Sequence, residues 1–216
     1  MMRKIQNGVS RPRGRPPIRC DDDTRRLIIE AAGEEFRANG YAATCMNNVA
    51  QRAGISTKTL YRLIPTKAEL FANVVSERIG RFILAIDDEV LDGLDPAAAL
   101  ERILIAYGTL ALAPEPIAMQ RLVIGESDRF PEIATTFYEA AVMRTTRAIE
   151  SWLRRQCERG LLRLDDTEVT AGMLRGMMVM EPQRAVMMGQ RAAPEAEEIA
   201  RRARLAAHLF LNGCRA

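Results

Sequence analysis

The apolar residues that follow the sequence DDDT recur every three or four positions, which is the spacing of an amphipathic helix. Ile28, Ala32 and Phe36 share one face of such a helix, and charged residues lie between them. The acidic residues from Asp21 onward stand where the helix dipole favours them, and Gly40 is a helix-ending signal. The pattern therefore predicts a first helix that begins near Asp21 and ends near Gly40.

Two shorter apolar patterns follow, and a glycine-containing turn separates them. Thr44 is expected to cap the first of these helices, and Ser56 is expected to cap the second, over residues 57–63. The sequence AGIS between them contains Gly54, which tolerates the positive φ of a tight turn. The sequence PTKAEL then begins a longer helix, which we expect to run to about residue 91.

Helical periodicity continues to the end of the chain, with proline and glycine between the segments. Ala, Leu, Arg, Glu and Met are abundant and aromatic residues make up only 5%, which favours helix. The sequence therefore predicts an all-α protein, with a small N-terminal three-helix unit followed by a larger C-terminal helical bundle. The helices expected in the bundle cover residues 96–112, 117–127, 132–159, 166–181 and 195–212.

The composition excludes several classes of protein. The chain is 48% hydrophobic and 27% charged, which is typical of a globular protein. No window approaches the roughly 18 apolar residues of a membrane span, so we expect no membrane partner. The four cysteines are scattered and His208 is the single histidine, so we expect no metal site and a cytoplasmic location. No catalytic constellation or phosphate loop is present, so we predict neither an enzyme nor a cofactor.

Unbalanced positive charge is confined to two N-terminal stretches. Residues 1–19 contain six Arg or Lys and no acid, whereas the net charge of the whole chain is only +3. The stretch from Phe36 to Ala68 also contains Arg and Lys but neither Asp nor Glu. These two stretches indicate a polyanionic partner for the N-terminal part of the chain.

The sequence VAQRAGISTKTLYRLIPTKAELF predicts a helix, a glycine-containing turn and a second helix, which is the order of a helix-turn-helix. In such proteins the second helix enters the major groove of DNA. Leu60 is expected to face the core, and the other side chains can reach phosphates or base edges. We therefore expect double-stranded DNA as a partner, contacted by Thr57, Lys58, Thr59, Tyr61 and Arg62.

This stretch, together with GYAATCMNNVAQRA before it, resembles the N-terminal DNA-binding domain of TetR-type transcriptional regulators. The resemblance covers about residues 23–71, and the chain departs from the family pattern at two positions. Ile64 stands where Phe is common, and Leu63 stands where Tyr or His is common. The matching residues are Gly54, Ser56, Thr59, Leu60, Tyr61, Lys67 and Leu70.

The resemblance implies a TetR-like fold of about nine helices and further DNA contacts from Thr44 and Lys67, with Tyr61 and Lys67 on phosphates. It also implies a ligand-responsive regulator, most simply a repressor that binds a palindromic operator as a dimer and is released by a small apolar effector. The expected divisions are a disordered basic arm over residues 1–20, a DNA-binding domain over 21–68 and a ligand-binding and dimerisation domain over 69–216.

The arm contains the sequence RPRGRPP, which cannot form a helix interior or a strand. It resembles the core of an AT-hook, in which Arg13 and Arg15 would lie in the narrow minor groove and Gly14 would allow close approach. A basic tail that only solvates the chain is the alternative. If the arm enters the groove, deletion of residues 1–19 weakens operator binding and flattens its salt dependence.

The last two helices, at residues 166–181 and 195–212, are expected to form the interface of a homodimer. Small residues recur along the second of them, and Gly172 and Gly176 lie one turn apart in the first. A seam within the core of one protomer is the alternative. The seam consists of Ala196, Ala200, Ala203, Ala207 and Phe210.

The middle helices are expected to enclose the effector. The sequence RLVIGESDRFPEIATTFYEA and the later RGLLRLDD are similar to the ligand-domain pattern of one large subgroup of TetR-like regulators. Methionine side chains adapt to apolar ligands, although they also fill ordinary gaps in a core. The candidate lining residues are Tyr107, Met119, Phe137, Met143, Trp152 and Met177.

One other function remains open at this point. The chain could be an architectural or activating DNA-binding protein in which the basic arm dominates and no effector exists. An architectural protein would spread over A·T-rich DNA, whereas a repressor would protect one palindromic site.

Overall fold

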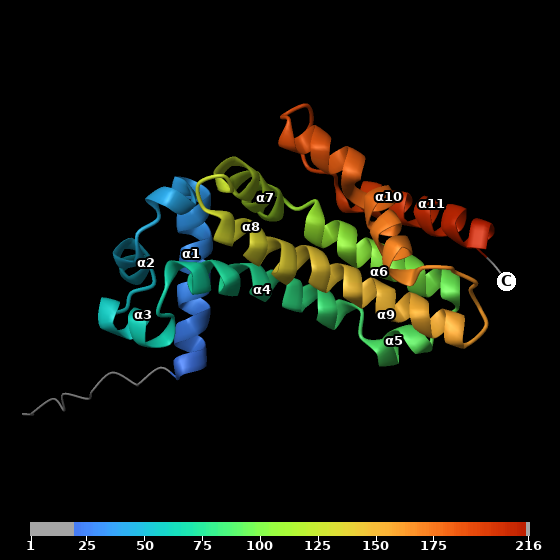
Figure 1. Cartoon of the computed structure of the whole chain (residues 1–216), viewed down its shortest axis with the longest axis horizontal. Coiled ribbons are helices and arrows are strands. Elements are labelled where there is room, and N and C mark those ends of the chain that lie inside the picture. Colours follow the sequence, from blue (N-terminus) through green and yellow to red (C-terminus); the bar gives the residue numbers. More distant parts are fainter. Residues whose placement is uncertain (1–19, 215–216) are drawn as a thin grey trace, which may run out of the picture.

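A computed structural model describes residues 20–214 of the chain, and every regular element within that range is helical (Figure 1). This confirms the all-α prediction. The elements are α1 (Asp21–Ala43), α2 (Met46–Arg52), α3 (Thr57–Leu63), α4 (Lys67–Ala85), α5 (Asp88–Asp92), α6 (Pro96–Ala111), α7 (Pro114–Glu126), α8 (Pro131–Phe137), the π-helical segment η1 (Tyr138–Met143), α9 (Arg144–Glu158), α10 (Thr167–Met187) and α11 (Ala196–Cys214).

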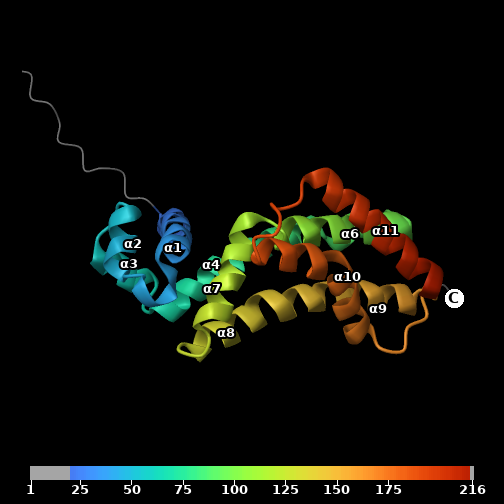
Figure 2. The same cartoon turned by 90° about the horizontal axis from the view of Figure 1, so that it is seen from above.

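The helices form an elongated molecule with two regions. The predicted DNA-binding region, α1 to α3 and called the DNA-binding unit below, lies at one end of the long axis, and α10 and α11 lie over the other half (Figures 1 and 2). Helix α4 runs from the DNA-binding unit into the bundle and packs against both α1 and α6. The regions therefore share one helix.

The core of the DNA-binding unit follows the predicted apolar pattern. Ile28, Ala32 and Phe36 are fully buried, and so is Leu60 of α3. The ring of Phe36 meets the ring of Phe71, on α4, edge to face with 5.5 Å between the centroids. This aromatic contact fixes α4 against α1.

The chain turns sharply after α1, at a segment that we call the corner (residues 40–44). Gly40 has φ 76° and ψ 177°, which interrupts the helix and confirms the predicted stop. The expected cap by Thr44 is wrong, because Cys45 occupies the N-cap position of α2. The Thr44 side chain is buried, and its hydroxyl donates to the carbonyl of Gly40 at 2.6 Å.

Two helix ends differ from the sequence prediction. Helix α4 ends at Ala85 and not near residue 91, because Asp87 caps the separate helix α5 by accepting from the backbone N–H of Glu89. Helix α10 continues through Pro182 to Met187, beyond the predicted end at residue 181. The amide of Gln183 donates to the carbonyl of Ala111, so a contact with α6 holds the additional turn.

Helices α8 and α9 form one continuous run with η1 between them, in agreement with the long helix predicted over residues 132–159. Thr145 donates to the carbonyls of Ala141 and Val142, and Thr146 donates to that of Val142. These hydroxyls thus donate to carbonyls of the wider π-helical turn. If this run counts as one helix and the short α5 is set aside, the described residues contain nine helices, as the resemblance implies.

The bundle packs around α6. Gly108 of α6 is required by close contact, since a Cβ atom there would lie 2.5 Å from Cε of Met178 and 2.9 Å from Cγ2 of Ile199. These two residues belong to α10 and α11, so α6 meets both helices closely. Trp152 of α9 is 1% exposed in the same core.

Candidate DNA-binding surface and effector pocket

Helix α3 presents polar side chains on its outer face, as predicted for a recognition helix. Leu60 and Leu63 are buried, whereas Lys58, Tyr61 and Arg62 are exposed. Ser56 caps the helix, because its Oγ accepts from the backbone N–H of Thr59 at 3.1 Å. The outer face of α3 thus presents an amine, a phenol and a guanidinium, which are groups that can bind phosphates or base edges of DNA.

Two of the predicted contact residues of α3 are less exposed. Thr57 and Thr59 are half-buried, and the hydroxyl of Thr59 lies 2.8 Å from that of Ser56. Arg13 and Arg15 of the predicted arm lie outside the described residues. Contact of any of these residues with DNA stays a prediction.

Arg62 is held by an ion pair with the first residue of α1. Its two terminal nitrogens donate to the carboxylate of Asp21 at 2.9 and 2.7 Å. The hydrogen bond from Arg62 lowers the pKa of Asp21, and the same contact raises the pKa of Arg62. Both side chains are exposed, so a phosphate can compete with Asp21 for this guanidinium.

Thr44 and Lys67 use their polar groups inside the protein. The Lys67 ammonium donates to the carbonyls of Tyr41, Ala42 and Thr44 at 2.8, 3.2 and 3.1 Å. It also lies 4.7 Å from the centre of the Tyr41 ring. Lys67 therefore ties the N-terminus of α4 to the corner, and its implied contact with a phosphate stays a prediction.

The opposite side of the corner is held by the bundle. Both carboxylate oxygens of Glu126, the last residue of α7, accept backbone N–H groups, from Tyr41 and Ala42, at 2.8 Å each. A Cβ atom on Gly40 would lie 2.6 Å from this carboxylate, so glycine is also needed for space. Charge-assisted hydrogen bonds of this kind are strong, and they join α7 directly to the DNA-binding unit.

A second link between the regions is ionic. Glu115, in the first turn of α7, lies 3.4 Å from Arg37 of α1 and 3.6 Å from Arg78 of α4. Burial lowers the pKa of Arg78, and the charge of Glu115 acts against this. One carboxylate is thus shared between the DNA-binding unit and a residue that lines the pocket described next.

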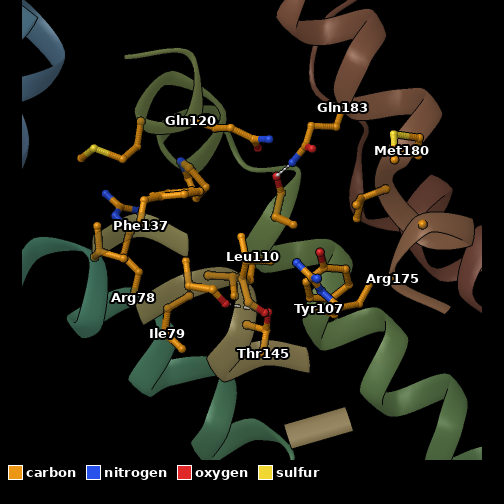
Figure 3. Close-up of a pocket in the computed structure, with 18 of the residues that line it drawn as sticks. Arg78, Ile79, Tyr107, Leu110, Gln120, Phe137, Thr145, Arg175, Met180 and Gln183 are labelled. Carbon is orange, nitrogen blue, oxygen red and sulfur yellow. Dashed lines mark hydrogen bonds between the residues drawn. The ribbon is translucent and has the colours of Figure 1, made fainter. Parts of the chain in front are cut away.

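The pocket lies in the bundle among α4, α6, α7, the run from α8 to α9, and α10 (Figure 3). Its volume is about 300 Å³, at the lower end of the range for small-molecule sites. Its walls are largely apolar and include Val74, Ile79, Leu110 and Val179. Such a cavity can enclose a small organic molecule.

Three of the six predicted lining residues face this pocket: Tyr107, Met119 and Phe137. The other three do not line it. Trp152 is packed in the bundle core, and Met177 lies on the outer face of α10, 38% exposed. Met143 ends η1, where Ala141 and Val142 line the pocket in its place.

The polar side chains of the pocket were not among the predicted lining residues. Adaptable apolar residues are the usual sequence signal for such a pocket, whereas a charged residue on an amphipathic helix ordinarily faces solvent. Helical spacing on α4 would have placed Arg78 one turn from the buried Val74 and Val75. The missed polar residues are Arg78, Gln120, Thr145, Arg175 and Gln183.

Arg175 is fixed in the pocket wall. Its guanidinium carbon lies 5.2 Å from the centre of the Tyr107 ring, and one terminal nitrogen donates to the hydroxyl of Thr146 at 2.9 Å. Burial raises the pKa of Tyr107, with Arg175 acting in the opposite direction. The Nε of Arg175 is buried and has no hydrogen-bond partner among the described residues.

The predicted small-residue seam of the last helix is divided between the surface and the core: Ala196 is exposed, and Ala200 and Phe210 are half-buried. Ala203 and Ala207 are buried in the protomer core where α11 packs on α6, as the alternative expected. Other apolar side chains of α10 and α11 are exposed instead. They are Val169, Met173, Met177, Met180, Leu205 and Leu209.

Residues 20–214 contain no cluster of His, Cys, Asp or Glu that could hold a metal ion. Within the same range no single helix is both long and apolar enough to cross a membrane. Helices α6 and α7 pass that test only as a pair, and the pair is bent by 62°.

A helix-turn-helix unit supported by a helical bundle with an internal pocket defines a DNA-binding transcriptional regulator. The family model described as bacterial regulatory proteins, tetR family, matches residues 28–74. The model described as AefR-like transcriptional repressor, C-terminal domain, matches residues 98–213. The chain therefore belongs to the TetR family, whose members are transcriptional regulators and not enzymes.

Individual relatives agree with this assignment. The chain is 27% identical over 153 residues to the uncharacterized HTH-type transcriptional regulator YhgD of Bacillus subtilis (strain 168), covering 69% of this chain and 77% of that protein. A TetR-family regulator from Mesorhizobium loti MAFF303099 has a similar fold, with TM-score 0.78 and 24% identity over 91% of this chain and 98% of that one. The structure of the flavonoid-responsive regulator FrrA is also similar, with TM-score 0.71 and 26% identity, over 90% of this chain and 98% of that one.

Proposed function

We propose that the protein is a ligand-responsive repressor, which binds a palindromic operator as a homodimer and releases it when a small effector with an apolar body enters the pocket. The observation that carries this proposal is that α7 connects the pocket to the DNA-binding unit. Glu126 at one end of α7 holds the corner. Glu115 at the other end contacts both Arg37 and Arg78.

Helix α4 supports the same coupling. Its first residue, Lys67, binds the corner, and Val74, Arg78 and Ile79 further along the helix line the pocket. A ligand that separates α4 from α7 changes the orientation of the DNA-binding unit. If the ligand binds the geometry that does not fit DNA more tightly than the geometry that does, it shifts the population away from the DNA-bound geometry.

Dimerisation is required because one short recognition helix contacts too little DNA for tight specific binding. Two such helices must reach successive major grooves, about 34–36 Å apart. The exposed apolar side chains of α10 and α11 supply the interface in this proposal, at the end of the molecule away from α3 (Figure 2).

Footprinting on the DNA upstream of the protein's own coding region tests the proposal. We expect protection of one palindromic site, and at least about tenfold weaker binding by Lys58→Ala or Tyr61→Ala, because each dimer loses two contacts. Arg144→Ala is the matched control, since it removes an exposed positive charge of α9, which belongs neither to the DNA-binding unit nor to the proposed interface, and it should bind as the unchanged protein does.

Protection spread over A·T-rich DNA without a preferred site would contradict the repressor proposal and favour an architectural protein. Equal affinity of the Lys58 and Tyr61 variants and of the unchanged protein would contradict the role of α3.

A further inference from the structure

The pocket carries positive charge with no acidic residue in its lining. Arg78 and Arg175 both contribute to its walls, and none of the lining residues is Asp or Glu. They enter from opposite sides, one from α4 and the other from α10 (Figure 3). Two guanidinium groups in a largely apolar cavity are an unfavourable arrangement unless something of opposite charge binds there.

Arg78 has only a weak internal partner. Its side chain is 37% exposed, and its ion pair with Glu115 is long, at 3.6 Å. The same carboxylate lies closer to Arg37, at 3.4 Å. One negative charge is therefore divided between two arginines, and Arg78 can take another anion.

Arg175 is ready to donate. The ring of Tyr107 and the hydroxyl of Thr146 hold its guanidinium in place, so little freedom is lost when a ligand binds. Its buried Nε has no hydrogen-bond partner among residues 20–214. A buried donor without a partner is rare in folded proteins, and it leaves the positive charge of Arg175 without full compensation inside the protein.

We propose that the effector is an organic acid, a single carboxylate on an apolar body, whose carboxylate is bound by Arg78 while the charge of Arg175 attracts it from the other side of the pocket, and whose body fills the apolar walls. This inference rests on the proposed function and names the ligand class of its pocket. Planar guanidinium groups match the geometry of a carboxylate. Val74, Ile79 and Leu110 provide the surface that an inorganic anion would leave uncovered.

The same contact supplies the signal. A carboxylate bound to Arg78 replaces Glu115 as its partner, and Glu115 then interacts with Arg37 alone. The link from α4 through α7 to α1 is thereby broken at the point where the ligand binds. The charged group of the effector, more than its bulk, thus loosens the DNA-binding unit.

Pairs of probes that differ only in charge test this inference. Octanoate and 2-naphthoate, each compared with its neutral amide, are titrated into the full-length protein at pH 7 and followed by calorimetry and by release of the mapped operator. We expect each acid to bind at least about tenfold more tightly than its amide, and only the acids to release DNA. Inorganic phosphate should bind weakly, because it lacks an apolar body.

Variants of the two arginines locate the charge effect. Arg78→Gln should abolish the preference for acid over amide, Arg175→Gln should weaken it, and Arg78→Lys should keep part of it. Arg81→Gln and Arg184→Gln are matched controls on α4 and α10, because both residues are exposed and neither lines the pocket. Thermal unfolding of each variant reports whether the Arg175 change alone alters the fold, and Arg78→Gln is the independent test.

Equal binding of acid and amide, an acid preference that survives both glutamine variants, or no binding of either acid would overturn the inference. If both amides release the operator as well as the acids do, the repressor function stands and only the charge assignment fails. If the acids bind with the expected preference but the operator is not released, the ligand class stands and the repressor function fails.

Discussion

Charged residues have different hydrogen-bond and ion-pair partners in the DNA-binding unit and in the pocket. In the DNA-binding unit, the nearly buried carboxylate of Glu35 accepts from Arg52 at 2.9 Å and from Asn39 at 2.7 Å. The hydrogen bond with Glu35 raises the pKa of Arg52, and a second one with Glu34 adds to this. In the pocket, Arg175 keeps a buried nitrogen without a partner, and Arg78 shares a distant carboxylate.

The difference separates two tasks. The DNA-binding unit must hold α3 in one geometry, so its polar groups are satisfied by partners that are present at all times. In the proposed function the pocket responds to a molecule from outside, and some of its polar groups would be left for that molecule. Changes in the first region should therefore alter stability, and changes in the second should alter response.

The largest effect should come from removing an aromatic ring from each region. Phe36→Ala opens a cavity at a fully buried site and should lower the free energy of unfolding by about 3–5 kcal/mol. Phe137→Ala enlarges an existing cavity beside a half-buried ring and should cost less than about 1.5 kcal/mol. Urea unfolding of both variants measures the contrast, and equal losses would contradict it.

A smaller effect is expected at the corner. Gly40→Ala places a side chain at φ 76° and within 2.6 Å of Glu126, and we expect a loss of about 2–3 kcal/mol. Gly54→Ala is the control, since it has φ 65° but open space around it, and it should cost about 1 kcal/mol. Thermal unfolding distinguishes the two, and similar losses would show that Glu126 does not restrict the corner.

The link through α7 should have a local effect. Glu126→Ala removes the acceptors of the N–H groups of Tyr41 and Ala42, so hydrogen exchange at these two amides should accelerate about tenfold or more. Asp128→Ala, an exposed acid two residues further on, should leave exchange at the corner unchanged. Unchanged protection in the Glu126 variant would mean that other contacts hold the corner.

The smallest effect should come from the exposed ion pair on the DNA-binding surface. Asp21→Asn releases Arg62 for a phosphate and should strengthen operator binding a few-fold at low salt, measured by fluorescence anisotropy. The pKa of Asp21 is lowered in the folded protein, so its stabilising contribution is present above a pH of about 4 and is lost as the pH falls below it. If the Asp21→Asn variant binds the operator no more tightly than the unchanged protein, and its stability at acid pH is the same, the ion pair has no effect.

The DNA-binding unit was more predictable than the pocket, for a physical reason. The faces of α1 and α3 follow from short-range periodicity, as Phe36 and Leu60 show, and the cap at Ser56 is a local interaction. The continuation of α10 past Pro182 depends on contacts with α6, which are distant in sequence. The role of Arg175 depends on Tyr107 of another helix, so helical spacing alone could not reveal it.

The π-helical segment η1 has a consequence for how this protein can evolve. A π-helical turn holds one more residue than an α-helical turn, so a single codon added or lost there rotates the side chains that follow. Ala141, Val142 and Thr145 would then be replaced in the cavity wall, while the residues of α3 would stay as they are. If the proposed function holds, ligand preference and operator preference can therefore diverge independently among descendants of one gene.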